Sequence, residues 1–196
     1  ATFAMSEALT IILKRNDPTA AAKQVSLTEL GSIRINKEER TKMLKTIPRT
    51  SIIGFIIGVL PGAGATIASF LAYGMERNLV KDEEKEKFGK GSVHGLAAPE
   101  TANNAACSGA FVPLLTLGIP GSGTTAVMLG ALLGFGIQPG PRLYMTNPEI
   151  FWSVIMSMYI GMVVLLILNL PLIPYIARIL AVPKNYLIPL ILFFSI

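Results

Sequence analysis

The chain has 196 residues, of which 52% are hydrophobic and only 15% are charged, and its mean hydropathy is +0.57. Soluble domains carry about 25% charged residues, and residues 91–196 fall far below that level, because their only charges are Glu100, Arg142, Glu149, Arg178 and Lys184. This composition excludes a disordered segment, a nucleic-acid-binding domain and an ordinary soluble enzyme. It predicts an all-α integral membrane protein embedded in a lipid bilayer.

The first apolar piece is followed by a long basic segment. Residues 1–13 are predicted to be the end of a membrane helix, so we expect the chain to be a piece of a longer protein. Residues 14–49 carry nine basic and four acidic residues, a net charge of +5. Basic loops beside membrane spans stay on the cytoplasmic side. We therefore expect 14–49 to be a cytoplasmic loop, in which Ser26–Glu29 starts a surface helix.

Residues 50–75 are apolar and uncharged, and Pro61-Gly-Ala-Gly64 interrupts them in the middle. Each flanking arm has eleven residues and would be about 16 Å long as a helix, half of a ~30 Å hydrocarbon core. The arms form either a re-entrant hairpin or two halves of one spanning helix. The charged loop 76–92 favours the hairpin, because its five basic residues also suit the cytoplasmic side.

A second interrupted segment covers residues 93–141. Pro99 and Glu100 indicate a helix start, with proline at the first position and an acid in the first turn. Pro113 is expected to kink or end this helix. Pro120-Gly-Ser-Gly123 then interrupts the apolar run in the same manner as the first break.

The last part of the chain is the most apolar. Residues 150–170 contain no charged residue, and their length suits a bilayer of about 30 Å. They are therefore predicted to be a transmembrane helix. Residues 171–196 are predicted to be a further membrane helix region, punctuated by Pro171, Pro174 and Pro183. Together the segments predict a multi-span helical bundle with two broken or re-entrant helical segments.

The most informative feature is an internal echo. Pro61-Gly-Ala-Gly-Ala-Thr66 and Pro120-Gly-Ser-Gly-Thr-Thr125 lie 59 residues apart, and both read P-G-small-G-small-T. Paired breaks in apolar segments point to the binding site of a transporter. Glycines let a ligand approach the backbone, and the helix that resumes after each break directs its free N–H groups at the gap. A carboxylate suits such a site; close packing of glycine and proline is the competing interpretation.

These arguments nominate two sets of residues. The predicted substrate-binding residues are Gly64, Ala65, Thr66, Asn103, Asn104, Ser122, Gly123, Thr124 and Thr125. The predicted ion-binding residues are Gly62, Gly121 and Glu100. Glu100 fits equally well as a partner of the helix dipole. We expect no cofactor other than a coupling cation. Backbone carbonyls at the breaks favour Na⁺ over H⁺, because proton coupling usually needs a titrating side chain.

Enzyme motifs are weak in this sequence. It contains no metal-ligand spacing and no phosphate-binding loop. His94 lies beside a charged loop, which favours a surface histidine, and Cys107 among small apolar neighbours is expected to pack as a small hydrophobe. An intramembrane serine hydrolase with a Ser122–His94 dyad is the least favoured alternative. A passive channel or a non-transporting scaffold is the other.

Three long strings resemble the large membrane subunit of tripartite tricarboxylate transporters. They are Gly58-Val-Leu-Pro-Gly-Ala-Gly-Ala-Thr-Ile-Ala-Ser-Phe-Leu-Ala-Tyr73, Ala98-Pro-Glu-Thr-Ala-Asn-Asn-Ala105 and the stretch from Pro113 to Pro141. The resemblance implies part of an inverted-repeat, multi-pass transporter of the bacterial inner membrane. It further implies a small membrane subunit and a periplasmic substrate-binding protein as partners. Together they would take up citrate and similar small organic carboxylates with a cation gradient, by alternating access.

Overall fold

The computed structural model describes residues 35–177 and 193, and the regular structure of these residues is entirely helical. The chain divides into two compact units, one of residues 34–161 and one of residues 1–33 with 162–196. The first unit contains α2 to α8 and the beginning of α9. The bounds of these helices are α2 Lys37–Val59, α3 Gly64–Leu79, α4 Asp82–Lys85, α5 Val93–Gly109, α6 Phe111–Leu117, α7 Gly123–Gly134, α8 Leu143–Thr146 and α9 Pro148–Ala177. The expected helix end at 1–13 and helix start at Ser26–Glu29 lie outside the described residues, as do residues 178–192.

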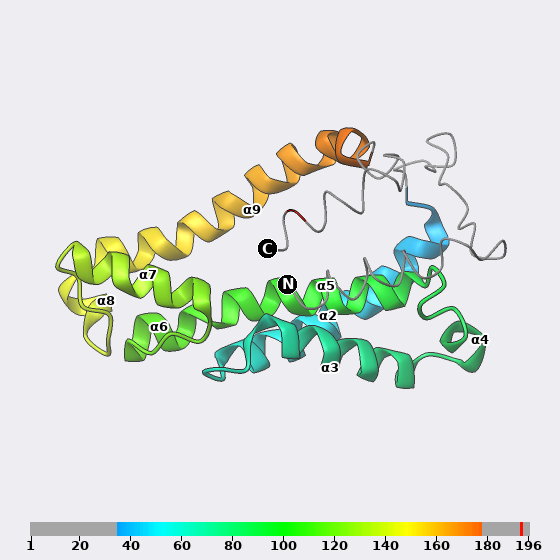
Figure 1. Ribbon diagram of the computed structural model, residues 1–196, viewed down its shortest axis with the longest axis horizontal. Coiled ribbons are helices and arrows are strands. Elements are labelled where there is room, and N and C mark those ends of the chain that lie inside the picture. Colours follow the sequence, from blue (N-terminus) through cyan, green and yellow to red (C-terminus); the bar gives the residue numbers. More distant parts are fainter. Residues whose placement is uncertain (1–34, 178–192, 194–196) are drawn as a thin grey trace. The chain divides into compact units, whose positions relative to one another are not determined.

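Helices α2 and α3 form an antiparallel hairpin (Figure 1). Its tip is the short turn between them, where Gly62 in the turn and Gly64 at the first position of α3 adopt left-handed φ angles of 82° and 66°. Only glycine takes such angles without strain. Ion pairs at the other end join Arg49 to Glu76 and Lys42 to Glu84, so both arms return to the same end. The arms are therefore not two halves of one straight helix.

Both arms extend beyond the predicted apolar segment. Residues 37–49, expected in a loop, form the first half of α2, and α3 continues past Met75 to Leu79. Asn36 starts α2 with a capping box, since its side chain accepts a hydrogen bond from the Glu39 N–H at 2.7 Å. The loop assignment of 37–49 was wrong because a charged helix stabilised by ion pairs one turn apart resembles a loop in composition.

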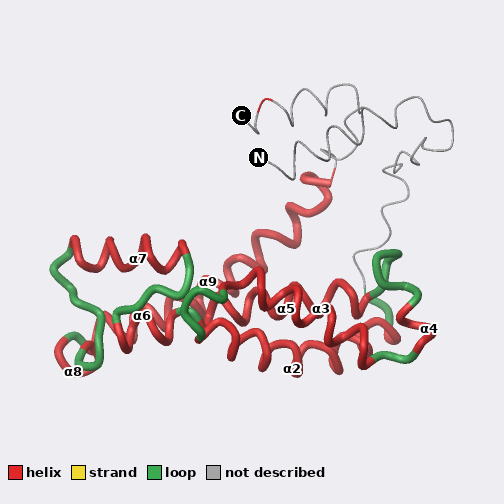
Figure 2. Tube along the Cα trace, turned by 60° about the horizontal axis from the view of Figure 1, so that its bottom comes forward, coloured by secondary structure: helices red, strands yellow, loops and turns green. Residues whose placement is uncertain are grey.

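Helix α5 packs along both arms of the hairpin (Figure 2). It begins at Val93 rather than at Pro99, because the Ser92 hydroxyl caps it by accepting a hydrogen bond from the Gly95 N–H at 3.1 Å. Pro99 therefore lies inside the helix, and the expected start at Pro99 was wrong. Helix α5 ends at Gly109, and Pro113 lies in the first turn of α6, where its missing N–H needs no partner.

The three long helices pack through stripes of buried residues spaced four apart, which together form the small-residue seam. The stripes are Thr46, Thr50, Gly54 and Gly58 on α2, Ala68, Ala72 and Glu76 on α3, and His94, Ala98, Ala102 and Ala106 on α5. A Cβ on Gly54 would lie 2.6 Å from the Ala102 Cα, and one on Gly58 would lie 2.5 Å from the Ala106 Cα. The backbones of α2 and α5 are thus in direct contact, as in closely packed membrane helices.

Helix α9 has 30 residues. Its part Pro148–Ile173 is, among the described residues, the one helix long and apolar enough to cross a membrane. This part includes the predicted transmembrane helix 150–170. We predicted that this helix ends at residue 170, before Pro171, but α9 runs through Pro171 to Ala177. A proline removes one helical hydrogen bond without necessarily ending the helix. The multi-span bundle stays a prediction.

The small-residue seam predicts a specific sensitivity to added methyl groups. We expect Gly58→Ala to destabilise the protein by about 1–3 kcal/mol, because the new Cβ would overlap the α5 backbone and force the helices apart. Thermal unfolding of the purified full-length protein in detergent measures this. The matched control is Gly74→Ala in α3, whose Cβ would meet nothing within 4 Å and which we expect to be neutral or slightly stabilising. Equal melting temperatures for the two variants would contradict the direct contact between the backbones of α2 and α5 at Gly58.

Candidate functional site

The two glycine-rich breaks meet at one pocket of about 700 Å³. Its lining residues are Gly62, Gly64, Ala65, Thr66, Cys107, Phe111, Pro120, Gly121, Ser122, Gly123, Thr124, Thr125 and Ala126. The close approach is also visible at Gly121, where an added Cβ would lie 3.5 Å from the carbonyl oxygen of Gly58 and 3.4 Å from the Cβ of Ala110. The structure therefore brings together two segments that the sequence echo singled out.

Both helices that leave the breaks begin at this pocket. Helix α3 starts at Gly64 without a side-chain cap, and α7 starts at Gly123 after the N-cap Ser122. The first N–H groups of a helix lack intrahelical partners and carry the positive end of its dipole. Two such helix starts on one pocket provide donors for an anion. No charged side chain occurs among the described residues that line it.

The hydroxyl groups at the pocket fall into two classes. Ser122 and Thr125 form a capping box, in which the Ser122 hydroxyl accepts from the Thr125 N–H at 3.2 Å and the Thr125 hydroxyl accepts from the Ser122 N–H at 2.8 Å. Thr125 is only 2% exposed. Thr66 and Thr124 are exposed, and their hydroxyls make no hydrogen bond to another described residue. A ligand can therefore reach Thr66 and Thr124, while Ser122 and Thr125 shape the start of α7.

The remaining predicted residues lie on α5 outside the pocket. Asn103 is exposed and lines a second cavity of about 400 Å³. The Asn104 amide donates a hydrogen bond to the Glu100 carbonyl oxygen at 2.9 Å. Glu100 is exposed and lies well inside α5, so its interpretation as a first-turn partner of the helix dipole was wrong. Cys107 is an exposed free thiol on the pocket wall and not the packed residue that we expected.

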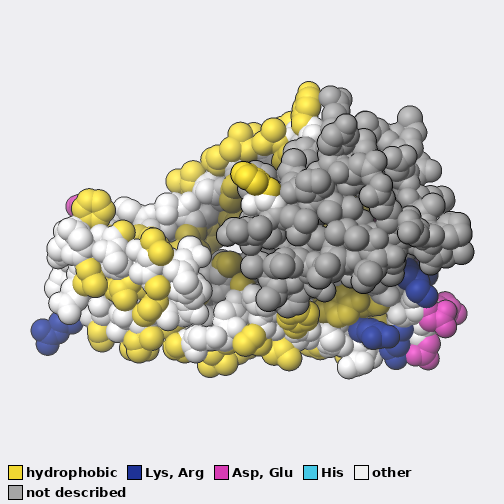
Figure 3. All heavy atoms as spheres, in the orientation of Figure 1, with side chains coloured by type: hydrophobic (Ala, Val, Ile, Leu, Met, Phe, Trp, Pro, Cys, Tyr) yellow, Lys and Arg dark blue, Asp and Glu magenta, His cyan; other side chains and the backbone are white. Residues whose placement is uncertain are grey.

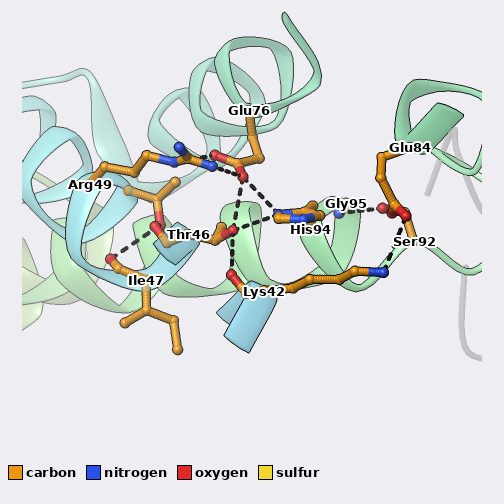
Figure 4. Close-up of polar contacts among 10 residues, drawn as sticks. Lys42, Thr46, Ile47, Arg49, Glu76, Glu84, Ser92, His94 and Gly95 are labelled. Carbon is orange, nitrogen blue, oxygen red and sulfur yellow. Dashed lines mark hydrogen bonds and ion pairs between the residues drawn. The ribbon is translucent and has the colours of Figure 1, made fainter. Parts of the chain in front are cut away.

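A buried polar cluster closes the opposite end of the small-residue seam, and sequence reasoning missed it (Figure 4). The Glu76 carboxylate, which is fully buried, accepts hydrogen bonds from the Arg49 Nε at 2.7 Å and the Thr46 hydroxyl at 2.8 Å. His94 Nδ1 lies 2.9 Å from the same carboxylate. A bare ring nitrogen would repel this oxygen, so Nδ1 carries the proton and donates it. The Glu76 cluster joins α2, α3 and α5.

The Glu76 cluster corrects two expectations. His94 is 8% exposed and bonded within the cluster, so it is not a surface histidine. Ser122 is bonded to Thr125 at the pocket, and the structure shows no contact between Ser122 and His94. Glu76, and not Glu100, is the buried acid of this region. Ala68, Ala72 and Glu76 are spaced four residues apart. This spacing was the one sequence signal that could have placed Glu76 on the buried face of α3.

The charges around Glu76 determine its ionisation. Burial raises the pKa of this carboxyl, but the hydrogen bonds from Arg49 and Thr46, the positive charge of Arg49 and the bond from His94 together hold its pKa below the ordinary value. Figure 3 shows other charged side chains gathered near this end, over α4. Glu76 is therefore an ionised carboxylate that holds the hairpin to α5.

Removing this charge is predicted to weaken the fold. We expect Glu76→Gln to lower the free energy of unfolding by about 1.5–3 kcal/mol, the value of hydrogen bonds to a charged group. Glu83→Gln, at an exposed position, serves as the control.

The same carboxylate makes the stability depend on pH. Because the pKa of Glu76 is lowered in the folded protein, its contribution to stability is complete above the ordinary glutamate pKa of about 4.3 and is lost as the pH falls through the lowered value. Melting temperatures between pH 3 and 7 measure this. If the difference in melting temperature between the wild type and Glu76→Gln stayed constant across this pH range, Glu76 would not be the ionised carboxylate that we infer.

The family model described as "Tripartite tricarboxylate transporter TctA family" matches residues 1–196. Two curated proteins of Agrobacterium vitis are similar to the chain. The "uncharacterized 52.8 kDa protein in TAR-I ttuC' 3'region" is 41% identical over 181 residues, which are 92% of this chain and 36% of that protein. The "uncharacterized protein in TAR-II ttuC' 3'region" is 46% identical over 142 residues, which are 72% of this chain and 58% of that protein. No solved structure matches.

Proposed function

The chain belongs to the tripartite tricarboxylate transporter TctA family, and we propose that it forms part of the membrane subunit of a secondary transporter for tricarboxylates or related organic carboxylates. The chain spans 36% and 58% of the length of the two relatives. The observation that carries the proposal is the pocket where both glycine-rich breaks meet. Broken helices around a shared site are typical of secondary transporters.

In this proposal the pocket binds a carboxylate with no basic side chain among its described lining residues. The N–H groups at the starts of α3 and α7 and the hydroxyls of Thr66 and Thr124 are the donors that this part of the chain supplies. A coupling cation would balance the remaining charge. Carbonyl oxygens beside Gly62 and Gly121 are the candidate ligands at the pocket, and this oxygen chemistry favours Na⁺ over H⁺. Glu100, the third residue predicted to bind the ion, lies on α5 outside the pocket.

Transport by this protein would follow alternating access in the bacterial inner membrane. A periplasmic binding protein would deliver the carboxylate, and a small membrane subunit would complete the assembly. In this proposal the basic segment 14–49 and the charged segment 76–92 both face the cytoplasm. The pairs Arg49–Glu76 and Lys42–Glu84 support a common side, because they join the described parts of both segments.

The proposal predicts which hydroxyl groups hold the substrate. We expect Thr66→Val and Thr124→Val each to raise the half-saturation concentration for uptake, because each removes a hydrogen bond to a charged group worth about 1.5–3 kcal/mol, or roughly 10- to 150-fold in affinity. Uptake of radiolabelled citrate into vesicles that contain the full-length protein and its partner subunits measures this.

Two control substitutions separate binding from folding. Thr116→Val on α6 changes an exposed threonine whose hydroxyl donates to the Val112 carbonyl oxygen, away from the pocket, and should leave uptake unchanged. Thr125→Val breaks the capping box and should lower the melting temperature through a loss of about 0.5–2 kcal/mol. If the uptake curves of Thr66→Val and Thr124→Val coincided with that of Thr116→Val, the hydroxyls of Thr66 and Thr124 would not bind the substrate.

The coupling cation can be identified with imposed gradients. We expect an inward Na⁺ gradient to drive accumulation of citrate at equal pH on both sides, because the candidate ligands are carbonyl oxygens. A passive channel would equilibrate citrate without accumulating it. If a pH gradient alone drives accumulation and Glu100→Gln abolishes it, the cation is H⁺ and the preference for Na⁺ is wrong.

A further inference from the structure

A second cavity of about 400 Å³ lies between α3 and α5, next to the pocket at the breaks. It is lined by Thr66, Ser69, Phe70, Tyr73, Pro99 and Asn103. Thr66 lines both cavities. On α5, Asn103 faces the second cavity and Cys107, one turn further, faces the pocket at the breaks. The two cavities are therefore consecutive along the same pair of helices.

The second cavity combines uncharged polar groups with aromatic rings. The Thr66 hydroxyl and the Asn103 amide make no hydrogen bond to another described residue, whereas the Ser69 hydroxyl is bonded to the Ala65 carbonyl oxygen at 2.9 Å and to the Pro99 carbonyl oxygen at 3.2 Å. Polar side chains inside a membrane segment face a cavity or a protein interior. Hydroxyl and amide donors without a fixed charge bind an anion weakly enough to release it, as an intermediate site along a transport path requires.

The second cavity extends along α3 away from the breaks. Thr66 lies in the first turn of α3, at the breaks, and Tyr73 lies two turns further, towards the end that carries Glu76. The Tyr73 ring contacts the ring of Phe88 in the segment between α4 and α5, with the centroids 5.2 Å apart. The cavity thus leads from the pocket at the breaks towards the charged end of the hairpin.

We propose that this second cavity is a carboxylate subsite on the cytoplasmic side of the pocket at the breaks. A carboxylate that leaves the helix starts of α3 and α7 passes Thr66 and is met by the Asn103 amide before it reaches the Tyr73–Phe88 contact. This inference rests on the proposed function, since it assigns a second station to the same substrate.

Cysteine accessibility tests the subsite in the full-length protein, reconstituted with its partner subunits. Asn103→Cys in a Cys107→Ser background is treated with a small anionic thiosulfonate, and citrate is the protecting ligand. We expect labelling to reduce citrate uptake at least tenfold and saturating citrate to slow labelling at least threefold. Ser69→Cys on α3 repeats the test from the opposite wall. The matched controls, Leu96→Cys on α5 and Leu71→Cys on α3, are exposed positions that line neither cavity, and neither should show protection.

The unmodified Cys107 separates the two proposals. If citrate protects Cys107 in the wild-type protein but protects neither Asn103→Cys nor Ser69→Cys, the subsite is wrong and the pocket at the breaks stands. If labelled Asn103→Cys and Ser69→Cys proteins transport citrate as fast as unlabelled ones, the subsite is likewise overturned. If the wild-type assembly takes up no tricarboxylate or related carboxylate, the proposed function fails and the subsite fails with it.

Discussion

Direct backbone contact between α2 and α5 is the constraint on which the rest of the first unit depends. Gly54 and Gly58 leave no side chain on the facing surface of α2, and Ala102 and Ala106 leave only methyl groups on that of α5. Such small residues let two helix backbones approach closely. The contact fixes the tip of the hairpin at the level where α5 ends, and only there can the break before α3 meet the break before α7.

The two ends of the small-residue seam have opposite chemistry. At one end, Glu76 is ionised and saturated with hydrogen bonds from α2 and α5. A buried carboxylate with all its partners is rigid, because the loss of any one of them leaves an unpaired charge. At the other end, the pocket has exposed hydroxyls at Thr66 and Thr124 and the start of α3, which no side chain caps. The Glu76 cluster, in which every polar group is hydrogen-bonded, can hold the three helices rigidly at one end. The hydrogen-bond donors at the pocket stay available for a ligand.

Sequence patterns revealed the part of this arrangement that depends on local chemistry. The echo of Pro61–Thr66 in Pro120–Thr125 identified both breaks, because proline and glycine act on the backbone wherever they occur. The start of α5 was misplaced, since the Ser92 cap competes with the signal of Pro99 and tertiary packing decides between them. The Glu76 cluster could not be read from composition, because its members come from three helices and Glu76 stands at the edge of a charged loop.

The neutral lining of the pocket has a thermodynamic consequence for the proposed transport. A carboxylate bound among hydroxyls and N–H groups retains net negative charge in a medium where charge is poorly solvated. A cation that binds beside it lowers this energy, and linkage requires the carboxylate to raise the affinity for the cation by the same factor. A basic side chain in the pocket would satisfy the anion permanently and would remove this mutual dependence. The lack of charge among the described lining residues is thus the feature that would oblige substrate and cation to bind together.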